Sequence, residues 1–181
     1  LTIIVPMLLV SAFIPKLVKH FGNKKTSWVS SLISGIIFFI LFFLPDNPWI
    51  YLGGTLIGAV FLMIPNMLVW GMVSDCIDYN QYLSGSRQEG AIYGLYSFVR
   101  KLGQAFAGFL SGVGLSIVGY TAGFELQSAT TLLGIKFLTI GVPAIAMIIA
   151  FLAYYFIWNL TPEKQVEIIK AITDEPHGEL N

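Results

Sequence analysis

The sequence contains little charge, one cysteine and two histidines. Asp, Glu, Lys and Arg make up 11% of the 181 residues, against about 25% in soluble domains, which excludes a soluble globular domain. The formal net charge is zero, so there is no electrostatic case for a nucleic-acid partner. Cys76 alone cannot form an internal disulfide or a cysteine metal cluster. Because His20 and His177 fall in a turn and a tail, we expect no enzyme, cofactor or metal site.

Apolar residues dominate the chain instead. Hydrophobic residues make up 56% of it, with 14 Phe, which is typical of an all-α integral membrane protein. Uncharged runs, set against the ~20 residues that cross a bilayer, predict five transmembrane helices. The spans are about 1–18, 27–45, 48–74, 90–118 and 132–158, forming one bundle over 1–159, and a tail with a short amphipathic helix occupies 160–181.

The first span begins at Leu1 without a charged flank or a signal-peptide pattern. We therefore interpret the chain as a fragment that enters partway through a helix. Lysines crowd the first connection between spans, whereas the connections on the other side contain no Lys or Arg. These lysines are Lys16, Lys19, Lys24 and Lys25. By the positive-inside rule the first connection is cytoplasmic, and alternation then places the 75–89 turn and the C-terminus in the cytoplasm.

Two cations, Arg100 and Lys101, interrupt the apolar span 90–118. If the helix starts near Glu89, Lys101 lies roughly 15–18 Å along it, about the middle of a ~30 Å hydrocarbon core. A cation at that depth costs at least ~2.5 kcal/mol on insertion scales. A polar stripe that spans an arc of about 100° on the helical wheel could meet this cost. The stripe contains Tyr93, Ser97, Arg100, Lys101, Gln104 and Gly108.

The position of this polar stripe on an otherwise apolar helix predicts that one side of the helix faces a cavity that holds water or a polar ligand. The alternative is that both cations snorkel to an interface from a helix that starts later. The preceding span carries a second polar stripe, which includes Asn66 and Trp70. That stripe has its own alternative, in which Asn66 bonds to another helix and Trp70 anchors at the interface. Two stripes on adjacent helices favour a shared polar cavity.

Charged residues also gather around the turn between these two spans. Asp75 and Asp78 point the same way if the helix continues through them, and Arg87 and Glu89 follow across the turn. The set is either a solvated loop or a group of salt bridges that can open and close. In the tail, Thr161 and Pro162 are typical of an N-cap and a first helical residue.

The residues of the turn and the charged span together resemble a known family. The pattern Asp75-x-x-Asp78-Tyr79, then Arg87-x-Glu89-Gly90, then Ser97-Phe98-Val99-Arg100-Lys101-Leu102-Gly103 is similar to that of the glycoside–pentoside–hexuronide:cation symporters of the major facilitator superfamily. The connection 15–25 fits the same superfamily. The resemblance covers essentially the whole chain, as helices eight to twelve of a twelve-helix carrier.

The resemblance implies a sugar or glycoside:cation symporter of the cytoplasmic (inner) membrane that works by alternating access. Its coupling cation, Na⁺ or H⁺, would bind in the missing N-terminal half of the same carrier. It implies cavity positions at Lys101 and Ser97. Asn66 stands where the melibiose carrier has a cavity tryptophan. This difference weakens the case for a melibiose-like galactoside, but we still expect a sugar substrate.

From the helical-wheel positions and the family resemblance together, we assign two sets of candidate residues. The substrate set is Lys101, Ser97, Gln104, Asn66, Trp70 and Tyr93, and the cytoplasmic gate set is Asp75, Asp78, Arg87, Glu89 and Arg100. Arg100 could instead lie in the cavity. Two other functions remain open: a major facilitator carrier for a non-sugar solute, and a non-transporting, permease-like sensor.

Overall fold

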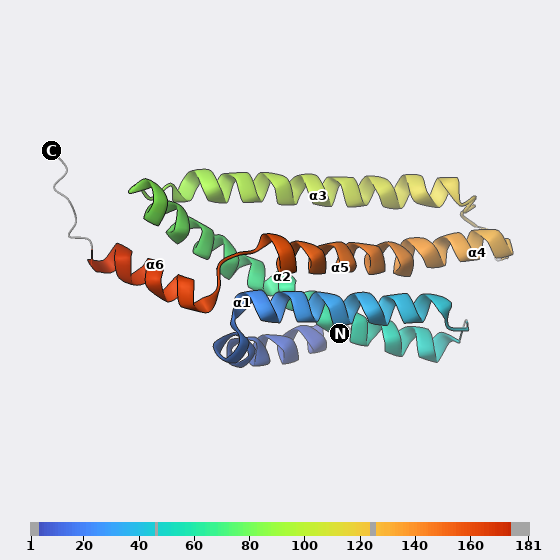
Figure 1. Ribbon diagram of the computed structural model, residues 1–181. Coiled ribbons are helices and arrows are strands. Elements are labelled where there is room, and N and C mark those ends of the chain that lie inside the picture. The colour runs from blue at the N-terminus through green and yellow to red at the C-terminus, as the bar shows by residue number, and fades with distance from the viewer. Residues whose placement is uncertain (1–3, 46, 124–125, 175–181) are drawn as a thin grey trace.

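The computed structural model describes residues 4–45, 47–123 and 126–174, and these form helices and no strands. The all-α prediction is therefore confirmed. The helices are α1 (Ile4–Phe43), α2 (Pro48–Ser84), α3 (Glu89–Ile117), α4 (Ala129–Lys136), α5 (Val142–Leu152) and α6 (Pro162–Asp174), with π-helical turns η1 (Phe137–Gly141) and η2 (Ala153–Ile157) (Figure 1). Within the described ranges, the stretches long and apolar enough to cross a membrane are Phe13–Phe43, Pro48–Ser84 and Ala129–Ile157.

Helix α1 folds back on itself at Gly22. The backbone there has φ 75° and ψ 164°, a conformation that glycine adopts without a steric penalty. The bend separates two limbs that run antiparallel (Figure 1) and correspond to the first two predicted spans. A Cβ on Gly22 would lie 2.6 Å from the Pro162 ring, so the bend packs directly against the start of α6.

Helix α2 is longer than the predicted span 48–74. It begins with Asn47 as N-cap, whose side chain accepts a hydrogen bond from the Trp49 N–H at 3.0 Å. It ends only at Gly85, which adopts the left-handed conformation with φ 67°. The predicted turn over 75–89 is therefore wrong in its first part, because no helix-terminating residue precedes Gly85. Asp75 and Asp78 lie on the helix, and the turn is 85–88.

Helices α4 and α5, with the two π-turns, form one continuous rod from Ala129 to Ile157. Ser128 caps its start by accepting a hydrogen bond from the Thr131 N–H at 3.1 Å. The first π-turn immediately precedes Pro143. The helix thus changes its winding locally near Gly141 and Pro143, as is common where a proline interrupts the hydrogen-bond ladder.

Small residues on the second limb of α1 let three helices approach closely. Ser27, Ser31 and Ser34 are fully buried, and the Ser34 hydroxyl donates to the Gly58 carbonyl of α2 at 2.9 Å. On the α5 side, a Cβ on Gly35 would lie 3.1 Å from the Ile148 side chain. This limb therefore packs against its neighbours through small residues, as is typical of helices in membranes.

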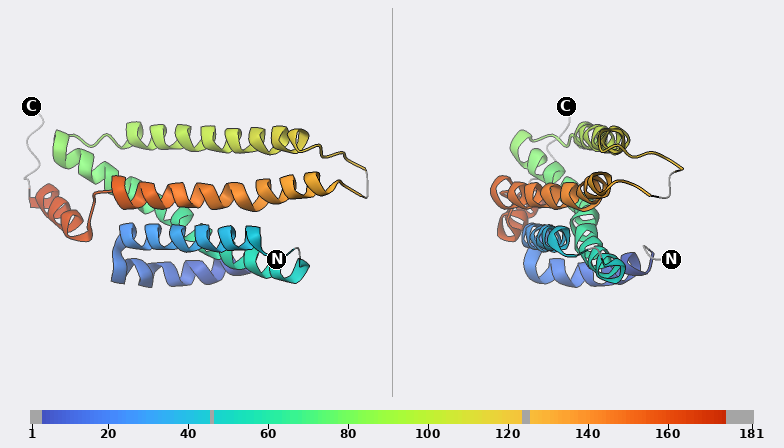
Figure 2. Two further views of the ribbon diagram at one scale, coloured as in Figure 1. Left: turned by 45° about the vertical axis from the view of Figure 1, so that its right-hand side comes forward. Right: turned by 90° about the vertical axis from the view of Figure 1, so that its right-hand side faces the viewer.

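Helix α3 stands apart from this core. None of its residues is buried, and it runs along the outside of the bundle beside the α4–α5 rod (Figure 2). The bend of α1, the 85–88 turn and α6 lie at the same end of the molecule (Figures 1 and 2), which we call the basic end because it carries the lysines of the first connection. The helices therefore alternate in direction as predicted.

The close approach of α1 and α2 generates a prediction about stability. A Cβ on Gly58 would lie 2.9 Å from two ring carbons of Phe38, whereas a Cβ on Gly53 meets nothing within 4 Å. Overpacking costs about 1–3 kcal/mol, and Gly→Ala at an open helical position gains roughly 0.5–1 kcal/mol. We expect Gly58→Ala to lower the thermal unfolding midpoint in detergent and Gly53→Ala to leave it unchanged or raise it. Equal midpoints for the two variants would contradict this packing.

Candidate functional site

A half-buried guanidinium joins α3 to the middle of α2. Arg100 Nη1 donates to the Tyr96 hydroxyl at 2.7 Å, and Nη2 donates to Asn66 Oδ1 at 3.4 Å. The guanidinium carbon lies 4.9 Å from the centre of the Trp70 ring. The cation is thus held by a hydroxyl, an amide oxygen and an aromatic face, each of which stabilises a positive charge away from bulk water.

Aromatic contacts fix the geometry around this cation. The Trp70 ring lies 5.3 Å from the Tyr96 ring at an interplanar angle of 74°, and 5.8 Å from the Tyr93 ring. Both arrangements are favourable for aromatic pairs. Trp70 is 44% exposed and Tyr93 is 46% exposed, so part of each ring stays accessible to a ligand. We call Asn66, Trp70, Tyr93, Tyr96 and Arg100 the Arg100 cluster.

Helical spacing explains why these side chains meet. Asn66 and Trp70 are i, i+4 on α2, and Tyr96 and Arg100 are i, i+4 on α3, so each pair forms a ridge on one side of its helix. The 85–88 turn folds the two ridges together. A cavity of about 300 Å³ opens beside the guanidinium, lined also by Pro65, Val69, Val99 and Tyr154.

Three predicted substrate residues lie beside the Arg100 cluster without joining it. Lys101 and Gln104 are exposed on α3 and Ser97 is half-buried. Within the described part of the chain, their side chains make no hydrogen bond or ion pair. Arg100 donates its hydrogen bonds to Tyr96 and Asn66, so in this structure it lies with the predicted substrate residue Asn66, as in the alternative given for it above. The rotation of α3 that seats Tyr96 against Trp70 turns Arg100 toward α2 and Lys101 away.

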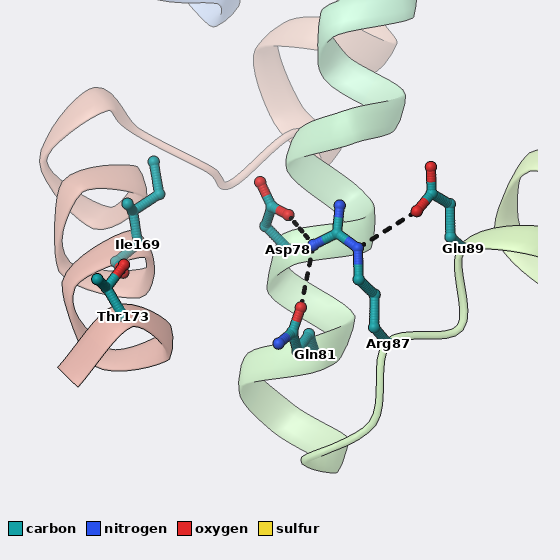
Figure 3. Close-up of polar contacts among 6 residues, drawn as sticks. All are labelled: Asp78, Gln81, Arg87, Glu89, Ile169 and Thr173. Atoms are coloured by element: carbon teal, nitrogen blue, oxygen red, sulfur yellow. Dashed lines mark hydrogen bonds and ion pairs between the residues drawn. The ribbon is translucent and has the colours of Figure 1, made fainter. Parts of the chain in front are cut away.

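Three residues of the predicted gate set, Asp78, Arg87 and Glu89, form an ion-pair group at the basic end (Figure 3). Arg87 Nη1 lies 2.9 Å from Asp78 Oδ1 and donates to Gln81 Oε1 at 3.0 Å, while Nε lies 3.3 Å from Glu89 Oε2. Hydrogen bonds to Asp78 and then Glu89 raise the pKa of Arg87 above its ordinary value. The Arg87 side chain is 46% exposed, so water competes with every one of these contacts. We call these four residues the Arg87 group.

Asp75 has different partners from the rest of the predicted gate set. Its Oδ2 accepts a hydrogen bond from Asn23 Nδ2 at 2.9 Å and another from Gln165 Nε2 at 2.7 Å. Asn23 follows the bend of α1, and Gln165 lies in the first turns of α6. Asp75 therefore ties α2 to both segments at the basic end, and it does not contact Arg87.

The sequence analysis missed five residues that the structure places in these groups or beside them. Tyr96 and Gln81 could have been found, because they stand one helical turn from Arg100 and Asp78. Asn23 and Gln165 could not, because they lie 52 and 90 residues from Asp75 and no local spacing connects them. Tyr154 could not have been found either, because it reaches the cavity beside Arg100 from η2, far away in the chain.

Comparisons with known proteins are consistent with this arrangement. Residues 1–161 match the family described as "MFS/sugar transport protein". The chain is 41% identical to "Uncharacterized symporter YjmB" of Bacillus subtilis (strain 168) over 88% of the chain and 35% of that protein. It is 36% identical to "Putative sulfoquinovose importer" of Salmonella typhimurium over 88% of the chain and 33% of that protein.

A third relative is "Glucuronide carrier protein homolog" of Escherichia coli (strain K12), 31% identical over 88% of the chain and 35% of that protein. The chain thus spans about a third of the length of these relatives. No solved structure matches the chain.

The two acids of α2 generate a prediction that separates their roles. Asp75→Ala removes the acceptor for Asn23 and Gln165, so the attachment of α6 to α2 should weaken and α6 should exchange its amide hydrogens faster. Asp78→Ala removes only an Arg87 contact and should leave α6 unchanged, which makes it the matched control. Hydrogen exchange over residues 162–174 measures both. An unchanged rate in Asp75→Ala, or equal increases in both variants, would contradict the tie.

Proposed function

Because the chain belongs to the MFS/sugar transport protein family, we propose that it is part of a sugar or glycoside:cation symporter of the cytoplasmic membrane. The carrier would work by alternating access, with the substrate near the bilayer midplane. The basic end would face the cytoplasm, because its lysines follow the positive-inside rule, and α6 would place the C-terminus there. Relatives named as a symporter, an importer and a carrier support this proposal.

The Arg100 cluster is the observation that carries the proposal. A guanidinium has five N–H donors, and the described contacts direct Nη1 to Tyr96 and Nη2 to Asn66. The remaining donors are free to bind a ligand. The exposed parts of Trp70 and Tyr93 offer flat apolar surfaces against which a sugar ring can pack. The cavity beside Arg100 is lined by Tyr96 and Tyr154, and donors beside aromatic side chains are typical of a binding site for a polar ring.

The charge of the site favours a substrate that carries an acidic group. Arg100 and Lys101 are adjacent, and neither forms an ion pair within the described ranges of the chain. A carboxylate or sulfonate on the sugar would neutralise this charge with strong hydrogen bonds, and it would offset the cost of keeping cations in the span. The printed names of two relatives, a glucuronide carrier homologue and a putative sulfoquinovose importer, are consistent with an acidic sugar.

The remaining candidate residues fit around this centre. We propose that Lys101, Ser97 and Gln104 line the continuation of the cavity toward the N-terminal half of the carrier, which would supply its other wall. The coupling cation, Na⁺ or H⁺, would bind in that half. The acids of α2 already have partners at the basic end, since Asp75 binds Asn23 and Gln165 and Asp78 binds Arg87.

The Arg87 group would serve as the cytoplasmic gate. Its contacts cross the 85–88 turn between α2 and α3 and lie in water, so they can break and re-form at low cost. Alternating access needs such a bistable element. The pairs would be closed when the cytoplasmic side is shut and open when the substrate is released.

Substitutions at Arg100 test the substrate proposal. In the complete carrier, Arg100→Gln should weaken binding and uptake of a hexuronate about 10- to 150-fold, since a hydrogen bond to a charged group contributes about 1.5–3 kcal/mol. Arg100→Lys should recover part of the lost binding and uptake, because it keeps the positive charge but loses the paired donors of the guanidinium. Lys101→Gln tests the neighbouring charge, and Lys170→Gln, on the exposed tail, is the control. The measurement is uptake of labelled sugars at matched protein levels.

The outcomes of this assay separate the alternative functions. Full hexuronate uptake by Arg100→Gln would refute the role of Arg100. Uptake of neutral glycosides alone would refute the acidic sugar and leave sugar transport standing. Transport of a non-sugar solute but no sugar would favour a different major facilitator carrier. Ligand binding without counterflow of labelled ligand would favour a sensor.

The gate generates a second prediction. Arg87→Ala should shift the complete carrier toward its inward-open state, because it removes the contacts to Asp78, Gln81 and Glu89 together. With Cys76→Ser as background, Ser97→Cys reports the shift by its reaction with a charged thiol reagent added from the cytoplasmic side, and the rate should rise severalfold. Gln88→Ala in the same turn is the control, since Gln88 bonds to Ser86. An unchanged rate in Arg87→Ala would count against the gate.

A further inference from the structure

Two cavities adjoin at the bend of α1, away from the Arg100 cluster and the Arg87 group. The first has a volume of about 450 Å³ and lies between the bend and the start of α6. The second has a volume of about 290 Å³ and lies between the two limbs of α1 and α2. Phe21 and Lys25 line both cavities, so the two are neighbours that share these side chains and differ in chemistry.

The first cavity is basic. Lys19, His20, Lys24 and Lys25 line it, and Glu163 is its one acidic lining residue. Within the described residues, none of the three lysines forms an ion pair. Lys25 Nζ lies 5.2 Å from the centre of the Phe21 ring, which holds this ammonium at the junction of the two cavities. An anionic group that enters here would meet several unneutralised cations.

The second cavity is apolar although two hydroxyl residues line it. The Thr26 hydroxyl donates to the Gly22 carbonyl at 2.8 Å, and the Ser30 hydroxyl donates to the Thr26 carbonyl at 2.6 Å. Both hydroxyls are thus satisfied by the backbone of α1. The rest of the lining includes Leu17, Val29, Ile33, Phe61 and Ile64. This part extends from the basic end along membrane-spanning helices, so it offers an apolar ligand a place within the bilayer.

We propose that the bend of α1 binds an anionic phospholipid, with its phosphate among the lysines and one acyl chain in the apolar cavity. The charge of the first part and the apolar lining of the second match the two ends of such a lipid. Lysine clusters at the edge of a membrane span attract anionic lipids electrostatically. A soluble phosphate would use only the first cavity, and a zwitterionic lipid would gain little from the lysines. The first cavity lies against the start of α6, so a bound lipid would also stabilise the position of α6.

Native mass spectrometry of the complete carrier in detergent tests the proposal. The probes are phosphatidylglycerol, phosphatidylcholine with the same acyl chains, and glycerol 3-phosphate as a headgroup without chains. Phosphatidylglycerol should bind at least about tenfold more tightly than phosphatidylcholine. Each lysine near an anionic lipid contributes to the binding free energy. The double variant Lys19→Gln with Lys24→Gln should therefore weaken phosphatidylglycerol binding about thirtyfold. Lys19→Arg with Lys24→Arg should retain it.

Two further variants keep the outcome interpretable. Ile33→Trp fills the apolar cavity without changing charge and should also reduce phosphatidylglycerol binding, while Lys170→Gln, which removes a charge from the outer part of α6, should not. Equal affinity for the two lipids, or full binding by the double glutamine variant, would overturn the proposal. Glycerol 3-phosphate binding as tightly as the whole lipid would also overturn it, because the acyl chain would then have no site.

Discussion

The contact between the Arg100 guanidinium and helix α2 determines how the rest of the site is arranged. A guanidinium in an apolar span is tolerated only if its donors and its charge are satisfied, and here Tyr96, Asn66 and Trp70 do so. Because α3 has no buried residue, little else in the described structure fixes its rotation. The contact therefore decides which side of α3 faces α2 and which side, with Lys101, faces away.

Helix α2 connects this contact to the basic end. Its middle carries Asn66 and Trp70, and its last turns carry Asp75 and Asp78. Asp75 is half-buried and binds the bend of α1 and helix α6, whereas Asp78 binds an Arg87 that is 46% exposed. The first set of contacts links α2 to the bend of α1 and to α6, whereas water can replace the second. The 85–88 turn is then the place where α3 would move in the gate proposed above.

The sequence predicted the helices well because hydropathy and length are local properties. It predicted two polar stripes on adjacent helices, but a stripe about 100° wide contains both Arg100 and Lys101. Choosing between them needs the rotation of α3, which the contacts of Arg100 with Asn66 and Trp70 set. The first charged residue after the apolar run, Asp75, predicts an end of α2 that is too early, because the helix continues to the left-handed Gly85. The partners of Asp75 lie far away in the chain and leave no local pattern.

The most direct test of this account is a structure of the complete carrier in a lipid nanodisc with an acidic sugar bound. The account predicts a carboxylate or sulfonate oxygen about 2.7–3.2 Å from a guanidinium nitrogen of Arg100, with the sugar ring against Trp70 and Asn66 still on the guanidinium. A bound sugar elsewhere, with the Arg100 side chain directed at acyl chains or at the headgroups, would contradict it.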